Sequence, residues 1–348
     1  MKIKGVDLFC GSGGLTCGLR RAGIDMVLGV DKEDYRTTYE KNNKKSVFWK
    51  TSIEGVTGDE ILKKIDLSKN DKFLLAACAP CQPFSLRNKN RNSETVDDDR
   101  KNLLCEVVRI IKEMKRKPDV IFAENVPGIQ ENPIFIQFQD FLFSLYYSVA
   151  SRVINAADYG TPQNRRRLIL IARKDGHIDF PRKTHGDGAD PHLTVRDALK
   201  GLPPISAGGE SEGFFNHHCR ALSPLNLKRI NTIPKDGGSR DSLSRSLVLE
   251  CHKKENVVHK DVYGRMAWDK PAPTLTTRCV SLTNGRFGHP TQNRAISVRE
   301  AARLQGFPDS YVFYGTGIDS EAKQVGNAVP VPLAEAFGRH FTSLLSNS

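Results

Sequence analysis

The chain has 348 residues, enough for one large and one smaller domain, since domains usually contain about 100 to 200 residues. Its 39% hydrophobic and 26% charged residues are typical of a globular protein and exclude a fibrous or disordered chain. Lysine and arginine outnumber aspartate and glutamate by 52 to 40, and the formal charge of +12 favours a polyanionic partner such as nucleic acid. A basic protein without such a partner remains an alternative on charge alone.

Cysteine usage and hydropathy indicate the compartment. The N-terminal segment has no apolar core followed by a small-residue cleavage site, and no run of 18 apolar residues occurs. Eight cysteines are too sparse for a disulfide scaffold in a chain of this length. We therefore expect a soluble intracellular protein with reduced thiols and no membrane association.

The first 180 residues alternate between short apolar runs and helical patterns. Apolar positions from Leu104 to Met114 recur at steps of three and four residues, which predicts an amphipathic helix. The alternation predicts an α/β fold with a mostly parallel sheet and helices on both faces. In chain order the pattern predicts a strand at 2–9, a glycine turn at 11–14, a helix at 15–22, and strands at 25–30, 73–79, 119–123, 151–155 and 167–172.

Beyond residue 182 the regular alternation fades. Glycine, proline and aspartate cluster at 185–191, 203–213 and 235–238, which predicts a second, loop-rich lobe over residues 183–290. Helical patterns return at 297–304 and 332–345. The chain is thus expected to divide into 1–182, 183–290 and a C-terminal segment, 291–348.

Two sets of residues lie where predicted strands end. Residues 7–14, Asp-Leu-Phe-Cys-Gly-Ser-Gly-Gly, follow the first strand, and Asp31 ends the second. Parallel sheets bind cofactors at this position because strand ends and helix N-termini open a crevice there and glycines let a ligand approach the backbone. The spacing is not the strict dinucleotide fingerprint, so the segment predicts a nucleotide-like site, with an ordinary tight turn as the alternative.

A thiol follows the strand at 73–79. Residues 80–85, Pro-Cys-Gln-Pro-Phe-Ser, place Cys81 in a loop bracketed by prolines at a strand's carboxyl end. Such a position can expose a nucleophile to a ligand.

Together with residues 7–14, this loop resembles the Pro-Cys-Gln loop of the cytosine-5 DNA methyltransferases of the compact prokaryotic and phage type. The resemblance implies a Rossmann-like domain that uses S-adenosyl-L-methionine, a smaller target-recognition domain at 183–290, and a C-terminal segment that returns to the catalytic domain. Further blocks similar to the family's motifs follow in order at 124–126, 163–167, 294–308 and 324–329.

The resemblance implies four catalytic residues. Cys81 would add as a thiolate to carbon 6 of cytosine, which turns the ring into an enamine-like nucleophile at carbon 5. Glu124 would hold or protonate ring nitrogen 3, and Arg167 would bind the exocyclic oxygen. Arg165 would brace the Cys81 and Glu124 loops and favour the thiolate. Because these groups cannot reach a stacked base, the cytosine should be flipped out of the duplex.

The methyl donor is expected to bind at strand ends and at the closing segment of the chain. Between the predicted strands at 25–30 and 73–79 many family members have an aspartate that bonds the adenine of the donor, whereas this chain has Ser52 at that position, whose hydroxyl could still accept a hydrogen bond. The donor-binding residues implied by the resemblance are Phe9, Gly11, Gly13, Gly14, Asp31, Ser52, Ile53, Pro80, Gly326 and Asn327.

Double-stranded DNA is the expected partner. Loop side chains of the second lobe would read base edges in the major groove. The resemblance further implies a monomer, located in the cytoplasm at the nucleoid, that acts alongside a cognate restriction endonuclease. The DNA-contacting residues that it implies are Gln82, Ser85, Arg87, Thr274 and Thr276.

Cys78 and Cys81 could form a redox pair, but Pro80 separates them. Histidines and cysteines at 217–219 and 251–252 lack the usual spacing of zinc ligands, so no metal is expected. The two functional rivals are an RNA cytosine methyltransferase, whose typical Cys-Phe-Thr segment is absent, and an inactive member of the family that only binds nucleic acid.

Overall fold

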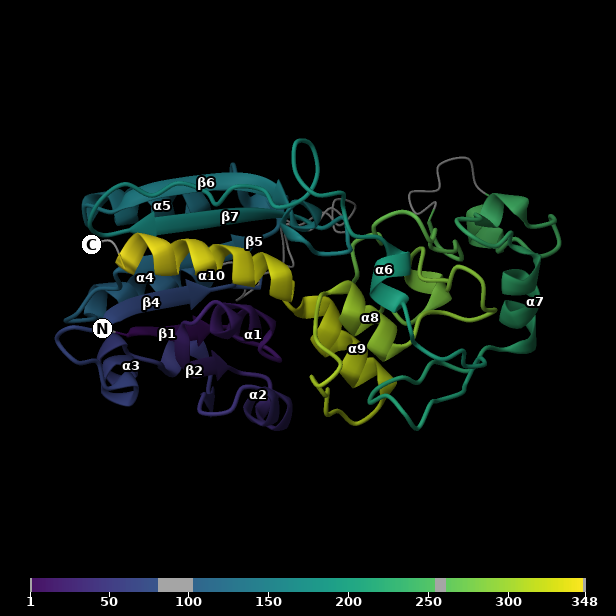
Figure 1. Cartoon of the computed structure of the whole chain (residues 1–348), viewed down its shortest axis with the longest axis horizontal. Helices are drawn as coiled ribbons and strands as arrows, with labels where there is room; N and C mark the ends of the chain where they lie inside the picture. Colours follow the sequence, from purple (N-terminus) through teal and green to yellow (C-terminus); the bar gives the residue numbers. More distant parts are fainter. Residues whose placement is uncertain (1, 81–102, 254–260, 347–348) are drawn as a thin grey trace. The chain divides into compact units, whose positions relative to one another are not determined.

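The computed structural model describes residues 2–80, 103–253 and 261–346. Four residues predicted to act in the site, Cys81, Gln82, Ser85 and Arg87, lie outside the described residues. The chain divides into two compact units, coloured along the sequence in Figure 1. Unit 1 comprises Met1–Ala156, Arg166–Lys183 and Val331–Ser348, and unit 2 comprises Ala157–Arg165 and Thr184–Pro330. Residues 291–330 therefore group with unit 2, and only the last helix groups with unit 1.

Unit 1 contains a seven-stranded sheet with the order β3-β2-β1-β4-β5-β7-β6. The first five strands in this order are parallel, and β7 runs antiparallel to both β5 and β6. This mostly parallel arrangement confirms the predicted fold class. The strands are β1 (Ile3–Leu8), β2 (Asp25–Asp31), β3 (Val47–Lys50), β4 (Lys72–Ala77), β5 (Val120–Asn125), β6 (Ser148–Asn155) and β7 (Arg166–Arg173).

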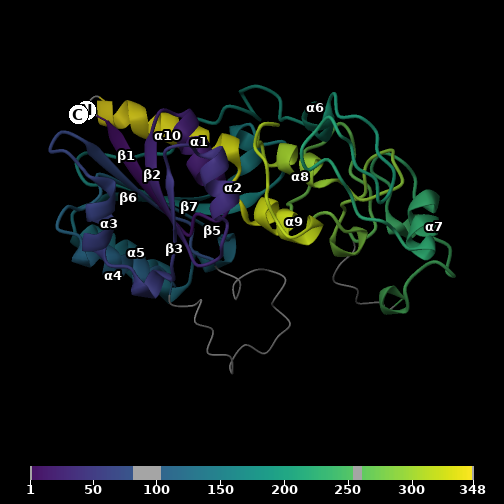
Figure 2. The ribbon, with the colours of Figure 1, turned by 90° about the horizontal axis from the view of Figure 1, so that it is seen from below.

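Helices cover both faces of this sheet (Figure 2), with α1 and α10 on one face and α3, α4 and α5 on the other. Gly18 of α1 permits close packing on α10, because a Cβ at this position would lie 2.5 Å from the Ala334 Cβ. The helices of unit 1 are α1 (Gly14–Arg21), α2 (Arg36–Asn42), α3 (Gly58–Ile65), α4 (Leu103–Glu113), α5 (Pro133–Ser144) and α10 (Val331–Ser346), with short 3-10 turns η1 (Ile53–Gly55) and η5 (Pro127–Ile129).

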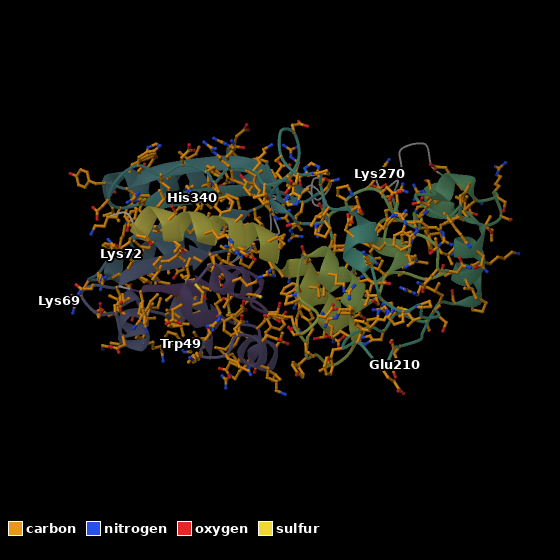
Figure 3. All side chains as sticks on the ribbon, viewed as in Figure 1. Trp49, Lys69, Lys72, Glu210, Lys270 and His340 are labelled. Atoms are coloured by element: carbon orange, nitrogen blue, oxygen red, sulfur yellow. The ribbon has the colours of Figure 1, made fainter. Side chains whose placement is uncertain are left out.

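The core of unit 1 follows from the sequence pattern. The central strands are buried on both faces, so β4 is almost continuously apolar instead of alternating. The predicted amphipathic helix forms as α4 and buries Leu104, Val107 and Ile111. At the sheet edge, Trp49 of β3 (Figure 3) is covered by Lys64, whose Nζ lies 4.5 Å from the ring centroid.

Unit 2 has little regular structure. Its helices are α6 (Val195–Leu199), α7 (Pro224–Thr232), α8 (Val298–Leu304) and α9 (Ile318–Asn327), and its 3-10 turns are η7 (Arg240–Ser242), η8 (Glu250–His252) and η9 (Leu282–Asn284); η6 (Ala156–Tyr159) begins at the last residue of a unit 1 segment. Loops connect these elements, as the glycine and proline clusters predict.

Two buried arginines of unit 2 join separate segments of the chain through hydrogen bonds. The Arg265 side chain is fully buried and donates to the backbone carbonyls of residues 230, 233, 289 and 292 and to the Asn293 side chain. Arg294 forms a bidentate pair with Glu300, both N–O distances being 2.7 Å. A buried charge is tolerated only when it is paired or fully hydrogen-bonded, and these two arginines meet that condition.

Within the described residues, no helix has the length and hydropathy required to cross a bilayer.

Candidate functional site

The glycine turn after β1 has the backbone of a ligand-binding loop. Phe9, Gly11 and Gly13 have φ values of 62°, 53° and 90°, and Gly13 precedes the first turn of α1. A Cβ at Gly11 would meet no atom of the described residues within 4 Å, so these residues leave the space beside this backbone open. Glycine is favoured at positive φ, and its bare backbone lets a ligand approach the turn.

Asp31 holds this turn against the end of β2. Its Oδ2 accepts a hydrogen bond from the Gly11 N–H at 2.8 Å, and its Oδ1 accepts from the Glu33 N–H at 2.9 Å. Burial raises the pKa of Asp31, and the two N–H donors oppose this rise. Each carboxylate oxygen keeps a lone pair that could accept a hydrogen bond from a ribose hydroxyl.

Three other residues predicted to bind the methyl donor, Ser52, Ile53 and Pro80, lie just after strands β3 and β4. The Ser52 hydroxyl donates to the Glu54 carboxylate, and Ile53 is buried in the core of unit 1. The Thr51 N–H donates to the Asp31 carbonyl at 3.0 Å, which ties the segment after β3 to the end of β2. Pro80, the last described residue before Cys81, is exposed.

Glu124 and Arg167 come together at the end of β5. In the antiparallel register Glu124 lies opposite Ile169, so Arg167 projects from the same face of the sheet two residues along β7. Arg167 Nε lies 2.7 Å from Glu124 Oε1, and each side chain is only about a tenth exposed, at 13% and 11%. The contact is an ion pair rather than a well-aligned hydrogen bond, because Oε1 lacks a hydrogen-bond partner among the described residues.

Cys78, three residues before Cys81, does not have the environment of a reactive thiol. Burial raises its pKa well above the ordinary value, and the negative charges of Glu124 and Asp7 raise it further. A thiol kept protonated in this way is a poor nucleophile and a poor redox partner.

Arg165 belongs to unit 2 and is buried there. It donates to the Leu275 carbonyl at 3.0 Å and to the Gly326 carbonyl at 3.3 Å. It thus joins the segment of the predicted DNA-contacting threonines to the end of α9. Its expected action on the Cys81 and Glu124 loops stays a prediction.

Gln163 is a structural residue for which the sequence predicted no role. Its amide donates to the Leu304 carbonyl at 3.2 Å and to Gln305 Oε1 at 2.9 Å, and its oxygen accepts from the Leu275 N–H at 2.9 Å. Its position in the 163–167 block was the only sequence signal. A fully buried amide with three partners fixes how these segments meet.

The remaining predicted residues of unit 2 differ in accessibility. The exposed Thr274 donates its hydroxyl to the Asn164 carbonyl at 2.6 Å, whereas Thr276 is half-buried and its Oγ1 accepts from the Arg278 N–H at 3.4 Å. Gly326 packs tightly, since a Cβ there would lie 2.2 Å from the Thr276 carbonyl oxygen. Asn327 is exposed at the last position of α9.

The histidines and cysteines at 217–219 and 251–252, considered above as zinc ligands, do not gather at one place in the described part of the chain. Among residues 2–80, 103–253 and 261–346, no three His, Cys, Asp or Glu side chains gather in a metal-binding arrangement. His217 instead contacts the Ser297 hydroxyl at 2.9 Å, and His218 pairs with Glu321 at 2.8 Å.

A mostly parallel sheet with a glycine turn after its first strand and an acidic residue at the end of its second is the arrangement of a Rossmann-like nucleotide-binding domain. The chain belongs to the C-5 cytosine-specific DNA methylase family, whose sequence model matches residues 3–343. It is therefore a DNA cytosine-5 methyltransferase.

Known proteins resemble it over most of their length. It is 41% identical to the Type II methylase M.HgiDII of Herpetosiphon aurantiacus, over 98% of this chain and 95% of that protein. It is 34% identical to the Type II methyltransferase M1.HphI of Haemophilus parahaemolyticus, over 100% of this chain and 88% of that protein. Among solved structures, S. pombe Dnmt2 methyltransferase superimposes with a TM-score of 0.66 at 16% identity, over 100% of this chain and 99% of that one, which supports the fold alone.

Proposed function

We propose that this enzyme transfers a methyl group from S-adenosyl-L-methionine to carbon 5 of a flipped-out cytosine in a short duplex DNA sequence. Cys81 forms a covalent bond to carbon 6 during the reaction. The observation that carries this proposal is the Glu124–Arg167 pair, since it places an acid and a cation 2.7 Å apart at the end of β5. Family membership supports the same chemistry.

The residues at the strand ends suit the donor. The open backbone at Gly11 and the two accepting oxygens of Asp31 match a nucleoside with ribose hydroxyls. Phe9, Gly13, Gly14, Ser52, Ile53 and Pro80 would complete this site, with Gly326 and Asn327 from the closing segment. When bound, the donor supplies a methyl group activated by a cationic sulfur.

The protein side chains activate the cytosine. The Cys81 thiolate adds to carbon 6, and Glu124 holds or protonates ring nitrogen 3 so that the ring accepts the added electron pair. Arg167 binds the exocyclic oxygen, and its ion pair with Glu124 keeps the two groups at fixed separation. Carbon 5 would then take the methyl group as its bond to the donor sulfur breaks and S-adenosylhomocysteine leaves. Loss of the carbon 5 proton and expulsion of the Cys81 thiolate would release methylcytosine.

The DNA partner follows from this chemistry. A cytosine in a stacked duplex exposes neither carbon 6 nor nitrogen 3 fully, so the base must leave the helix. Gln82, Ser85 and Arg87 would contact the opened duplex, and Thr274 and Thr276 would contact it from unit 2. The Type II methyltransferases that resemble this chain support a restriction-modification context. In that context the enzyme would act as a monomer beside a cognate endonuclease.

Covalent trapping tests the proposal. In duplex DNA that carries 5-fluorocytosine, methyl transfer leaves no carbon 5 proton to lose, so the Cys81 bond should persist through denaturing electrophoresis. The wild type should form this adduct only when S-adenosyl-L-methionine is present. Cys81→Ser should form none while retaining DNA binding, because a hydroxyl is far less acidic than a thiol. An equal adduct in Cys81→Ser would remove this residue from the mechanism.

A further inference from the structure

A line of buried hydroxyl groups runs from the carboxyl end of β1 to the loop before β3. The Thr16 hydroxyl donates to Asp7 Oδ2 at 2.8 Å. The Tyr39 hydroxyl lies 3.0 Å from the Thr16 hydroxyl and 3.0 Å from the Ser46 hydroxyl. These four side chains come from β1, α1, α2 and the loop after α2, so the line connects separate segments of unit 1.

Packing fixes the middle of this line. Tyr39 is fully buried, and its ring contacts Phe48 at a centroid distance of 5.5 Å. Gly29 of β2 leaves the space that the phenol fills, because a Cβ there would lie 2.5 Å from the Tyr39 hydroxyl oxygen. This packing restricts the phenol, and its hydroxyl contacts Thr16 and Ser46 within the described part of the chain.

The Asp7 carboxyl at the head of the line is incompletely bonded. Asp7 is fully buried near the carboxyl end of β1, and its Oδ1 has no hydrogen-bond partner among the described residues. Buried polar atoms without partners are rare, and at a ligand-binding turn such an atom indicates a missing water or ligand contact.

Several titratable groups surround Asp7, namely Asp31 from β2, Tyr39 from α2, Cys10 from the glycine turn and Cys78 from the segment after β4. None of these side chains is a cation. Burial raises the pKa of Asp7 to about 7, and the charge of Asp31 adds to the rise while the Thr16 hydroxyl opposes it.

We propose that Thr16 and Tyr39 are positioning residues for the methyl donor, which hold the Asp7 carboxyl beneath the glycine turn so that donor binding is coupled to release of a proton from Asp7. This inference rests on the proposed use of S-adenosyl-L-methionine. A bound donor would carry a positive sulfur, and a positive charge beside Asp7 would favour the ionised form of this buried carboxylate. Because burial raises the pKa of Asp7 to about 7, part of the Asp7 population is protonated near neutral pH, and binding should release that fraction of a proton.

Calorimetry of the whole protein tests the coupling. Titrations with S-adenosyl-L-methionine in buffers of different ionisation enthalpy count the protons released on binding. S-adenosylhomocysteine, whose sulfur is uncharged, should release fewer protons than the donor. Asp7→Asn should abolish the difference between the two ligands.

Matched variants test the positioning role. Tyr39→Phe removes one hydroxyl from the line and should weaken donor binding about five- to tenfold, with little change in kcat at saturating donor. Tyr147→Phe is the control, because Tyr147 is also buried in unit 1 and donates to a carbonyl, but it precedes β6 at the opposite edge of the sheet. Thr16→Val should resemble Tyr39→Phe, and Thr16→Ser should restore binding.

The outcomes separate the two proposals. Failure of the wild type to bind the donor would overturn the proposed function and this inference together. Normal donor binding with equal effects of Tyr39→Phe and Tyr147→Phe would overturn the positioning role alone. If Tyr39→Phe does not fold, Thr16→Val and Thr16→Ser decide the question, since equal donor affinities in these two variants would contradict it.

Discussion

Replacement of Asp7 by Asn should change how the stability of the protein depends on pH. The folded protein raises the pKa of this carboxyl from 3.8 to about 7. Between these values the folded protein holds a proton that the unfolded chain has lost. Unfolding then releases a proton, so the stability contributed by this group falls as pH rises through this window and is constant above it.

The size of the effect follows from the shift in pKa. A shift of about 3 units at about 1.4 kcal/mol per unit gives a total penalty of about 4 kcal/mol for ionised Asp7 above pH 8. At pH 5 only about 1 to 2 kcal/mol of this penalty is present. The asparagine variant keeps a carbonyl oxygen that can accept from Thr16 and carries no charge, so its stability relative to the wild type should rise by about 2 to 3 kcal/mol between pH 5 and pH 9.

Urea unfolding at several pH values between 5 and 9, followed by circular dichroism, measures this difference. The matched control is Asp140→Asn, which changes an exposed aspartate on α5 of the same unit. A constant difference between Asp7→Asn and the wild type across this range would refute the account of Asp7 as a buried carboxyl that titrates near neutral pH.

Three further substitutions probe the site and the second unit. Glu124→Gln should lower kcat at least about 100-fold with little loss of DNA binding, because an amide cannot donate a proton as the acid can; methyl transfer and gel shift measure the two. Glu300→Gln should destabilise unit 2 by about 3 kcal/mol in urea unfolding, because it leaves the buried Arg294 charge uncompensated. Gly326→Ala should cost about 1 to 3 kcal/mol, because the added Cβ would lie 2.2 Å from the Thr276 carbonyl oxygen.

Each of these expectations can fail. Unchanged kcat in Glu124→Gln would exclude proton donation by this side chain. A loss below about 1 kcal/mol in Glu300→Gln would mean that Arg294 finds other acceptors. Gly213→Ala is the control for Gly326→Ala, since a Cβ at Gly213 would meet no atom within 4 Å. Equal stability of these two alanine variants would show that the α9 contact is not tight.

The sequence predicted the sheet of unit 1 well because its signals are local. Apolar runs ended by glycine or aspartate identified β1 and β2, and a clear three- and four-residue periodicity identified α4. The pattern did not single out α5, whose apolar residues occur around most of the helix instead of on one stripe. The local sequence pattern predicts where a strand occurs but not the direction in which it runs beside its partner. The antiparallel pairing of β7 with β5 is therefore known only from the structure.

In unit 2 the sequence pattern predicted the loops but not the buried arginines. Its loops were predicted from glycine and proline, but beside its apolar core it buries several arginines, which sequence rules place on the surface. Arg265 is buried because backbone carbonyls from separate segments converge on it, and such convergence is a tertiary property. In the site, the resemblance to the family singled out Glu124 and Arg167 at separate positions, and their pairing depends on the β5–β7 register.

The most direct test of the central claim is transfer of labelled methyl from S-adenosyl-L-methionine to genomic duplex DNA by the purified protein, followed by bisulfite sequencing. The account predicts 5-methylcytosine in one short sequence context, and no incorporation by Cys81→Ser. Incorporation into transfer RNA instead of DNA, or donor binding without any methyl transfer, would contradict it.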